Sequence, residues 1–477
     1  MFGFPTRVRN LYLAEPRKRN SDDWQVVDRQ LDLAVATFAP HAETVWDKEL
    51  HTAVGLANFI PRVGRPPAAD PRPLGQVHPI TVCHRCRSVG HQDASNPAMA
   101  CPECSAAGED FASIQLAEPT GFRSAYWPED YDGESTRGQR SSTPRITPDR
   151  SEMAQVDVGA ARAHSGPCDL FVINDKGGSL YHFAPAMDGK SWIDVDLWEE
   201  NQQSGRFRLP GIQHGQAERV ALGMAKKTDA LLVGPKIWPD GLDLLPFDPG
   251  RRGAWYSLGF LLRIVATRQL DIDVEELNVG YSVRQVDGRT LVDVFLSDQL
   301  ENGAGYSSHL GRATELRKLL DGTDDYIAQS LAQPPHDQCD SSCYRCLRDY
   351  YNSMFHPLLD WRLGRDLLDL LLGRPFDTTR WNDIEYLLAK SFTEDFDGDC
   401  ISLDGGVSAI KTRDKILIVR HPFESPTLDN DYENVHLCAR IDSAIVDAED
   451  QGSDRQIRFV SSFDLQRRPG WVLATIT

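Results

Sequence analysis

Polar and apolar residues alternate at a period of two along much of the middle of the chain, and this pattern predicts β-strands. In residues 168–197 the apolar runs are broken by Asn-Asp-Lys-Gly-Gly and Asp-Gly, which are turn sequences typical of hairpins. Further strands are predicted at 228–235, 276–283 and 290–296. Residues 252–272 instead carry apolar side chains at helical spacing, so this segment is predicted to form a buried helix.

Helical and strand patterns are mixed in the remainder of the chain. A glycine turn at 302–305 precedes a predicted helix that ends near residue 319, and residues 358–373 form a predicted amphipathic helix. Residues 376–477 combine strand-like runs, ILIVRH and IRFVSSF, with helix-like runs, WNDIEYLLAKSF and AIVDAEDQ. The chain is therefore predicted to have an α+β, mixed multidomain fold that ends in a small α/β domain.

The N-terminal third is less periodic. Residues 1–78 are predicted to contain an extended arm, a helix over 24–38 and short strands before the proline-rich stretch at 61–75. Residues 127–164 are rich in Asp, Ser, Arg, Pro and Gly, which is typical of an exposed linker or a mobile loop.

Composition places the chain among globular proteins. At 477 residues it is too long for one hydrophobic core, and it is 41% hydrophobic and 25% charged. It has no run of about eighteen apolar residues, and its first segment carries charges where a secretory signal is apolar. We therefore expect a cytoplasmic protein with no membrane partner. The net charge of −19 argues against unselective coating of nucleic acid but allows a local basic groove.

Four cysteines form two C-x2-C pairs separated by fourteen residues: Cys83 with Cys86, and Cys101 with Cys104. Thiolates at this spacing can bind one metal ion, and two such pairs complete a closed tetrahedral shell. The alternative is four unrelated buried thiols, which this spacing disfavours. The pattern predicts a structural zinc ribbon, because a closed shell leaves no open position for catalysis.

A second cluster, Cys339-x3-Cys343-x2-Cys346, supplies three thiols and requires a fourth ligand. His336 precedes it and His356 follows it. We expect His356 to be the ligand, because it is predicted to begin the next helix and could turn back onto the cysteines. The alternative is three core cysteines without metal.

These features divide the chain into five predicted segments. They are an N-terminal segment (1–78), the zinc ribbon (79–108), a linker or mobile loop (109–166), a mixed α/β core with the second cysteine cluster (167–375) and a C-terminal α/β domain (376–477).

The opening segment is locally basic and interleaved with aromatic residues. It contains Arg7, Arg9, Arg17, Lys18 and Arg19. One interpretation is a solvated entry segment. The other is contact with the DNA backbone or with an acidic partner.

Signals for catalysis are weak. Residues 184–191 match a loose phosphate-loop pattern, but Asp-Gly followed by strand-like alternation predicts a hairpin turn. No acidic box for ATP hydrolysis is present. Acidic residues near Asp271, Asp273 and Asp298 could hold a divalent cation, so a metal-dependent nuclease is the alternative function.

Several strings resemble the MrfA-type zinc-binding domain. They are Asn302-Gly-Ala-Gly-Tyr306, the run from Cys339 through Asn352, and His356-Pro-Leu-Leu-Asp-Trp361. The segments RGAWYSLGFLLRIVATRQLDID, MFGFPTRVRNLY and LAVATFAPHAETVWDKELHTAVG resemble the region that follows the motor domains of certain superfamily-two DNA helicases. The family's cluster usually has a fourth cysteine, and Tyr351 occupies that place here.

The resemblance covers about residues 1–365, and the module also occurs in the non-ATPase B subunit of the DISARM antiphage system. It implies a non-catalytic, zinc-stabilised subunit that partners a superfamily-two helicase or ATPase and assists DNA binding in antiphage defence. A further hypothesis is a regulatory lock, in which the mildly acidic segment 128–150 mimics DNA.

Overall fold

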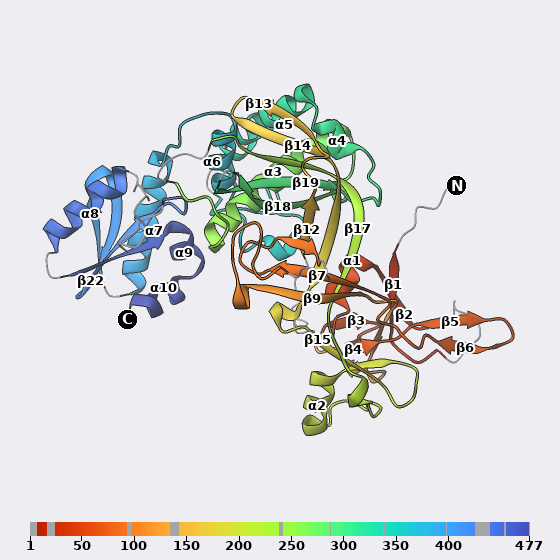
Figure 1. Cartoon of the computed structure of the whole chain (residues 1–477). Helices are drawn as coiled ribbons and strands as arrows, with labels where there is room; N and C mark the ends of the chain where they lie inside the picture. Colours follow the sequence, from red (N-terminus) through yellow and green to blue (C-terminus); the bar gives the residue numbers. More distant parts are fainter. Residues whose placement is uncertain are drawn as a thin grey trace. The chain divides into compact units, whose positions relative to one another are not determined.

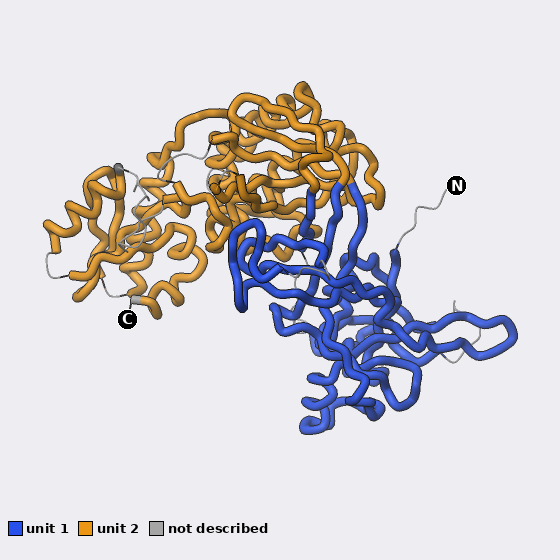
Figure 2. Tube along the Cα trace, viewed as in Figure 1, with its two compact units in different colours: residues 1–148, 168–228 blue, residues 149–167, 229–477 orange. Residues whose placement is uncertain are grey.

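The chain forms two compact units in the computed structural model, one of residues 1–148 and 168–228 (unit 1) and one of residues 149–167 and 229–477 (unit 2), as Figure 2 shows. The structure describes residues 7–16, 24–92, 98–133, 143–237, 242–286, 288–336, 339–396, 398–424, 439–452 and 455–476. Two of the three unit boundaries fall inside long strands, β14 (Ala161–Asn174) and β17 (Glu218–Pro235), and the third directly follows β12 (Thr143–Pro148), all labelled in Figure 1.

Unit 1 is built mainly from β-strands. Strand β4 is central, because it pairs antiparallel with β3, β10, β11 and β16. A second group joins β7 to β8 and β9, and β9 pairs parallel with β17. The elements are β1 (Val8–Tyr12), β2 (Val26–Gln30), α1 (Leu31–Thr37), β3 (Glu43–Trp46), β4 (Glu49–Leu56), β5 (Phe59–Arg62), β6 (Arg65–Ala69), β7 (Gln76–Cys83), β8 (Val89–His91), β9 (Phe111–Glu118), β10 (Phe122–Ser124), β11 (Glu129–Asp130), β12 (Thr143–Pro148), β15 (Tyr181–Pro185), β16 (Trp192–Asp194) and α2 (Val195–Ser204).

Unit 2 combines a buried central helix with two sheet regions. Its elements are β13 (Ala154–Val158), α3 (Pro249–Leu270), β18 (Leu277–Val286), β19 (Arg289–Asp298), α4 (Tyr306–Leu310), α5 (Ala313–Tyr326), α6 (Trp361–Leu371), α7 (Asn382–Asp395), β20 (Asp399–Leu403), β21 (Val407–Lys411), β22 (Lys415–Arg420), α8 (Ala439–Gln451), β23 (Gln456–Ser461), α9 (Ser462–Arg467) and α10 (Pro469–Ile476). The fold class is confirmed as mixed α+β with a small α/β region at the C-terminus.

Helix α3 illustrates how local sequence sets an element's limits. Asp248 caps its N-terminus by accepting a hydrogen bond from the backbone N–H of Arg251, and Pro249 occupies the first helical position. The helix ends at Asp271, whose φ of 54° is left-handed. Because most of its residues are buried, α3 forms the core of unit 2.

The C-terminal region forms a four-stranded sheet in the order β20-β21-β22-β23. The first three strands are antiparallel, whereas β22 and β23 are parallel and are linked through α8. A parallel pair requires such a crossover connection, and here the crossover is helical. The predicted strands and helices of this region are therefore confirmed.

Two expectations for the N-terminal third differ from the structure. Residues 26–30 form a strand rather than the start of a helix, because Val26 and Val27 pair antiparallel with β1, and only 31–37 are helical. Residues 109–166, expected as a linker, contain β9 to β13, apart from 134–142, which lie outside the described residues. Buried apolar positions in β9 and β12 explain why these segments pair rather than remain exposed.

Residues 184–191, which match a loose phosphate-loop pattern, form a hairpin turn, as predicted. Strands β15 and β16 pair antiparallel, and Ala186 and Ser191 are hydrogen-bonded across the turn. Lys190, the lysine of the pattern, forms an ion pair with Glu15 at 2.6 Å. Within the described part of the chain, no helix combines the length and hydropathy needed to cross a membrane.

Candidate metal centres and the acidic cavity

The first centre consists of Cys83, Cys86, Cys101 and Cys104 in unit 1. Strand β7 ends at Cys83, and the following turn brings Cys86 back beside it. Ligand atoms of all four residues lie within 4.8 Å of one another. The structure therefore brings together all four cysteines that the sequence predicted as one set.

The distances in this centre fit a tetrahedral zinc ion. The Sγ atoms of Cys83 and Cys104 are 3.6 Å apart, and so are those of Cys86 and Cys101. Zinc–sulfur bonds of about 2.3 Å give a tetrahedral edge of roughly 3.8 Å, whereas a disulfide requires about 2.05 Å. All four cysteines are free thiols. The donor set and its spacing therefore suit a closed structural zinc site.

Both halves of the centre have the same local geometry. The residue after each C-x2-C pair adopts a positive φ, 65° at Arg87 and 59° at Ser105. Backbone N–H groups also point toward sulfur, as the N–H of Glu103 does toward Cys101 Sγ at 3.4 Å. These tight turns bring the two thiols of each pair close together.

The thiols compete for protons in the absence of an ion. The pKa of Cys101 is lowered because Cys83 and Cys86 form hydrogen bonds with it, and the pKa of Cys86 is raised by its hydrogen bond with Cys101. Burial raises the pKa of Cys104 to about 12. A bound zinc ion would remove this competition, because it stabilises the thiolate form of every ligand. Ser88 Oγ lies 3.2 Å from Cys86 Sγ and 3.1 Å from Cys101 Sγ, and no spacing pattern in the sequence marks this residue.

The second centre lies in unit 2 and includes His336. Ligand atoms of His336, Cys343 and Cys346 lie within 4.8 Å of one another, and His336 Nδ1 is 3.7 Å from Cys343 Sγ. The backbone N–H of Cys343 donates to Cys346 Sγ at 2.9 Å. Burial raises the pKa of the Cys339 thiol, and Cys343 and Cys346 perturb it further, but Cys339 is not part of this group of ligand atoms. Two thiols and one imidazole leave one position of a tetrahedral zinc site to a further ligand, and Cys339 stays a predicted ligand.

His356 lies elsewhere, which differs from the expectation that it would be the fourth ligand. Its Nε2 donates to the backbone oxygen of Asp349 at 3.1 Å and to Asn352 Oδ1 at 2.8 Å. Burial lowers the pKa of His356. The helix expected to begin at His356 begins at Trp361 instead, so the histidine stabilises the loop after the cysteines. The spacing His336-x2-Cys339 matches the usual C-x2-C spacing and was the signal for the histidine that lies beside Cys343 and Cys346.

Side chains of helices α6 and α9 form hydrogen bonds with the backbone of the loop that carries the second centre. Arg362 of α6 donates to the backbone oxygens of Cys339 and Asp340 at 2.6 and 3.1 Å. Gln466 of α9 donates to the same oxygen of Asp340 at 2.8 Å. These bonds connect the cysteine loop to the α/β region at the C-terminus.

Asp298, a candidate nuclease residue, is fully buried at the end of β19. Its carboxylate accepts hydrogen bonds from the backbone N–H groups of Ala304, Tyr306 and Ser307 and from the Ser307 hydroxyl, at 2.7 to 3.1 Å. It therefore organises the Asn302–Tyr306 turn and the start of α4, and its oxygens are occupied by protein donors.

Glycine is required in this turn at Gly303. Its φ is 75°, and a Cβ atom here would lie 2.8 Å from the carboxylate carbon of Asp229. Burial raises the pKa of Asp229, and the nearby charge of Asp298 raises it further. The turn that carries part of the resemblance is thus a folded element supported by two carboxylates.

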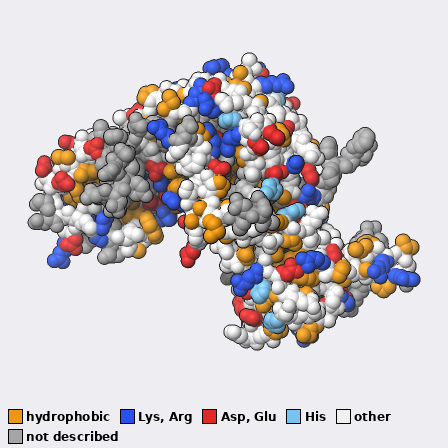
Figure 3. Space-filling model, viewed as in Figure 1, with side chains coloured by type: hydrophobic (Ala, Val, Ile, Leu, Met, Phe, Trp, Pro, Cys, Tyr) orange, Lys and Arg blue, Asp and Glu red, His pale blue; other side chains and the backbone are white. Residues whose placement is uncertain are grey.

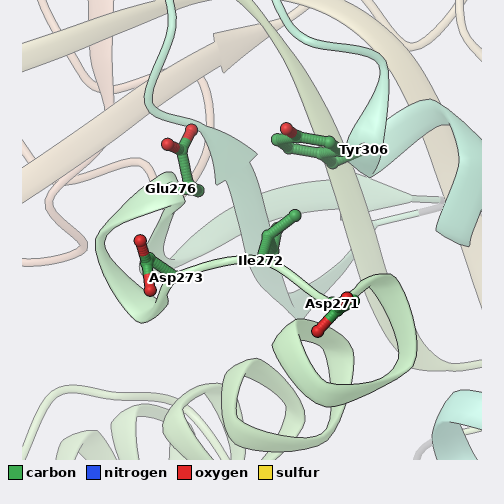
Figure 4. Close-up of a pocket in the computed structure, with 5 residues that line it drawn as sticks. All are labelled: Asp271, Ile272, Asp273, Glu276 and Tyr306. Carbon is green, nitrogen blue, oxygen red and sulfur yellow. The ribbon is translucent and has the colours of Figure 1, made fainter.

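The other acidic candidates line a cavity of about 280 Å³, drawn in Figure 4. Asp271 lies at the end of α3, Asp273 and Glu276 lie on the turn before β18, and Tyr306 begins α4. Asp298 does not line this cavity. Its lining residues include no lysine, arginine or histidine. The structure therefore brings Asp271 and Asp273 together but separates Asp298 from them.

The basic candidates of the N-terminal segment are only partly described. Arg7 Nη1 bonds with the Glu118 carboxylate at 3.2 Å and with the backbone oxygen of Ala225 at 2.8 Å. Arg9 donates to the backbone oxygen of Pro119, and burial lowers its pKa. The side chains of these two arginines therefore form hydrogen bonds within unit 1, and this argues against their contacting a DNA phosphate. Arg17, Lys18 and Arg19 lie outside the described residues.

Together, the fold and the two centres define a mixed α+β protein with two cysteine-rich sites suited to zinc. The chain is 30% identical to the Druantia protein DruE of Escherichia coli (strain UMEA 4076-1) over 167 residues, which is 33% of this chain and 9% of DruE. No family model matches the chain.

Two crystal structures of the DUF1998 helicase MrfA, each 9% identical in sequence, align with 76% of this chain. The one bound to DNA has a TM-score of 0.34 and is covered over 34% of its length. The one bound to DNA and AMPPNP has a TM-score of 0.29 and is covered over 32%. TM-scores of this size do not establish a common fold.

Proposed function

We propose that this chain is a zinc-stabilised, non-ATPase subunit that partners a superfamily-two DNA helicase and assists DNA binding in antiphage defence, as in a DISARM-like system. The second centre is the observation that carries the proposal. Cys343 and Cys346 belong to a string that resembles the MrfA-type zinc-binding domain, and they lie there together with His336. His336 is our candidate for the ligand that the family's fourth cysteine, replaced here by Tyr351, would otherwise supply.

The turn that folds over Asp298 adds support. The Asn302–Tyr306 string is part of the same resemblance, and Asp298 holds it in one conformation. The identity shared with the Druantia protein DruE over 167 residues also supports a role in a defence system. Catalysis would reside in the partner, because the phosphate-loop pattern of this chain is a hairpin turn.

Removing one thiol of the second centre should disable this function while the rest of the chain folds. We expect the wild-type chain to co-purify with the ATPase encoded beside its gene and to raise that enzyme's DNA-stimulated ATP hydrolysis. Cys346→Ser should lower this stimulation at least about tenfold, because zinc and the attached loop are lost. The measurement is the ATPase rate of the reconstituted complex with and without DNA.

Cys400→Ser is the matched control, because Cys400 is a half-buried thiol outside both centres. It should retain the stimulation of the wild type. The proposal fails when the wild-type chain neither joins the ATPase nor binds DNA at low salt, or when Cys346→Ser stimulates as well as the wild type.

A further inference from the structure

A two-stranded hairpin projects from unit 1 with its tip in solvent. Strands β5 and β6 pair only with each other among the described strands, with Ile60 opposite Ala68 and Arg62 opposite Arg65. Residues 60–66 are all exposed, and Val63 at the tip is fully so. Figure 1 shows this hairpin, and Figure 3 shows hydrophobic and basic side chains gathered at the same place.

The base of the hairpin is firmly anchored. The rings of Phe59 and Tyr12 pack edge-to-face, with their centroids 5.0 Å apart. The backbone N–H of Phe59 also donates to the Tyr12 hydroxyl at 3.1 Å. Asp70, which follows β6, accepts hydrogen bonds from Thr120 and Asn58 at 2.8 and 3.4 Å. A lone hairpin is marginally stable in water, so this anchor holds the exposed tip in a defined shape.

The tip also has a defined turn. Gly64 adopts a φ of 71°, which glycine accepts without strain. Pro61 lies where the strand register shifts, because it has no N–H for the ladder. The turn at Gly64 therefore gives the exposed tip a defined backbone path.

The charge of the hairpin contrasts with that of the chain. The net charge of the chain is −19, yet residues 59–69 contain two arginines and no acidic residue. Arg7 and Arg72 of the same unit bond with Glu118 and Glu218. The side chains of Arg62 and Arg65, by contrast, have no hydrogen-bond or ion-pair partner among the residues that the structure describes.

We infer that this hairpin inserts into the minor groove of duplex DNA. Arginines favour the negative potential of a narrow minor groove, and isoleucine or proline side chains act there as apolar wedges. The apolar residues of the tip are Ile60, Pro61, Val63, Pro66 and Pro67. The inference rests on the proposed function, because it takes DNA as the ligand.

Other nucleic-acid sites fit the hairpin less well. Single-stranded DNA is usually held by aromatic rings that stack on bases, and residues 60–69 contain none. Arginine can also recognise guanine in the major groove, but apolar side chains there contact only the thymine methyl group, so that groove gives Ile60, Pro61 and Val63 less to do. Arginine with small apolar wedges matches the minor groove best.

The test compares the full chain with a double variant, Arg62→Ala with Arg65→Ala. Fluorescence anisotropy with a labelled A·T-rich duplex should show affinity at least about tenfold weaker for the variant, and a slope of log K against log salt smaller by about two. Netropsin, which fills the minor groove, should compete with the wild type. The variant should fold normally, because neither side chain has a partner, and its zinc content should equal that of the wild type.

The control removes two arginines from the tips of other hairpins, Arg289→Ala with Arg413→Ala, and should bind DNA like the wild type. If the wild type binds duplex DNA and the Arg62/Arg65 variant binds equally well, the hairpin inference is overturned while the proposed function stands. Binding that netropsin does not weaken, or that is confined to single strands, also overturns it. Absence of any DNA binding by the wild type, alone or with the helicase, overturns both.

Discussion

Replacing Cys86 with serine is expected to abolish zinc binding at the first centre and to unfold the turn from Cys83 to Ser88 that carries its first cysteine pair. Cys86 is almost completely buried, and its Sγ lies 3.6 Å from that of Cys101. A hydroxyl is a far weaker zinc ligand than a thiolate. Structural zinc contributes roughly 10–16 kcal/mol of apparent binding free energy in small zinc modules, which is comparable to the stability of a whole domain.

Two measurements check this prediction. Elemental analysis should show a loss of about one zinc equivalent per chain. Trypsin should cleave after Arg85 and Arg87 much faster than in the wild type, because both arginines lie in the first cysteine turn. Cys400→Ser should match the wild type in both assays. Unchanged zinc content and unchanged cleavage in Cys86→Ser would show that the four thiols are packed together without a metal.

Replacing Asp298 with asparagine should destabilise unit 2 by about 3 kcal/mol. The buried carboxylate accepts from four donors, three of them backbone N–H groups. An amide nitrogen cannot accept, so at least one buried donor of this turn loses its partner and faces another donor. The midpoint of urea denaturation, followed by pulse proteolysis, should fall accordingly.

The matched control is Asp273→Asn, because Asp273 is an exposed carboxylate of the same unit. It should change the free energy of unfolding by less than about 0.5 kcal/mol. The same pair tests the nuclease alternative. If Asp298→Asn keeps the wild-type midpoint but loses a magnesium-dependent cleavage of DNA that the wild type performs, Asp298 is catalytic and the structural role fails.

The sequence predicted best the elements whose signals are local. Helices α3 and α6 and the hairpin of β18 and β19 were all recognisable, because their periodicity is continuous and turn residues flank them. The first centre was predictable for the same reason, since two short C-x2-C turns determine most of its geometry.

The remainder depends on partners that are distant in sequence. Strand β10, for example, is only three residues long, and it forms by pairing with β1 and β4, which precede it by many residues. Nothing in its own sequence identifies these partners. Long-range pairing also explains why the local sequence of segment 109–166 predicts a linker although much of the segment forms β-sheet.

The choice between the two histidines of the second cluster shows the same limit. Both flank the cysteines, and the outcome depends on the path of the loop after Cys346. His356 is hydrogen-bonded to Asn352 and to the backbone of Asp349, whereas His336 lies beside Cys343. Likewise, Asp298 appears in the sequence as one more acidic residue, and only the turn that folds over it reveals its structural role.

The second centre is the feature on which the proposed function rests, and zinc stoichiometry tests it most directly. After dialysis against a competing chelator, we predict about two zinc equivalents for the wild type and for His356→Ala, and about one for His336→Ala. About one equivalent in the wild type, or loss of zinc from His356→Ala and not from His336→Ala, would contradict the account.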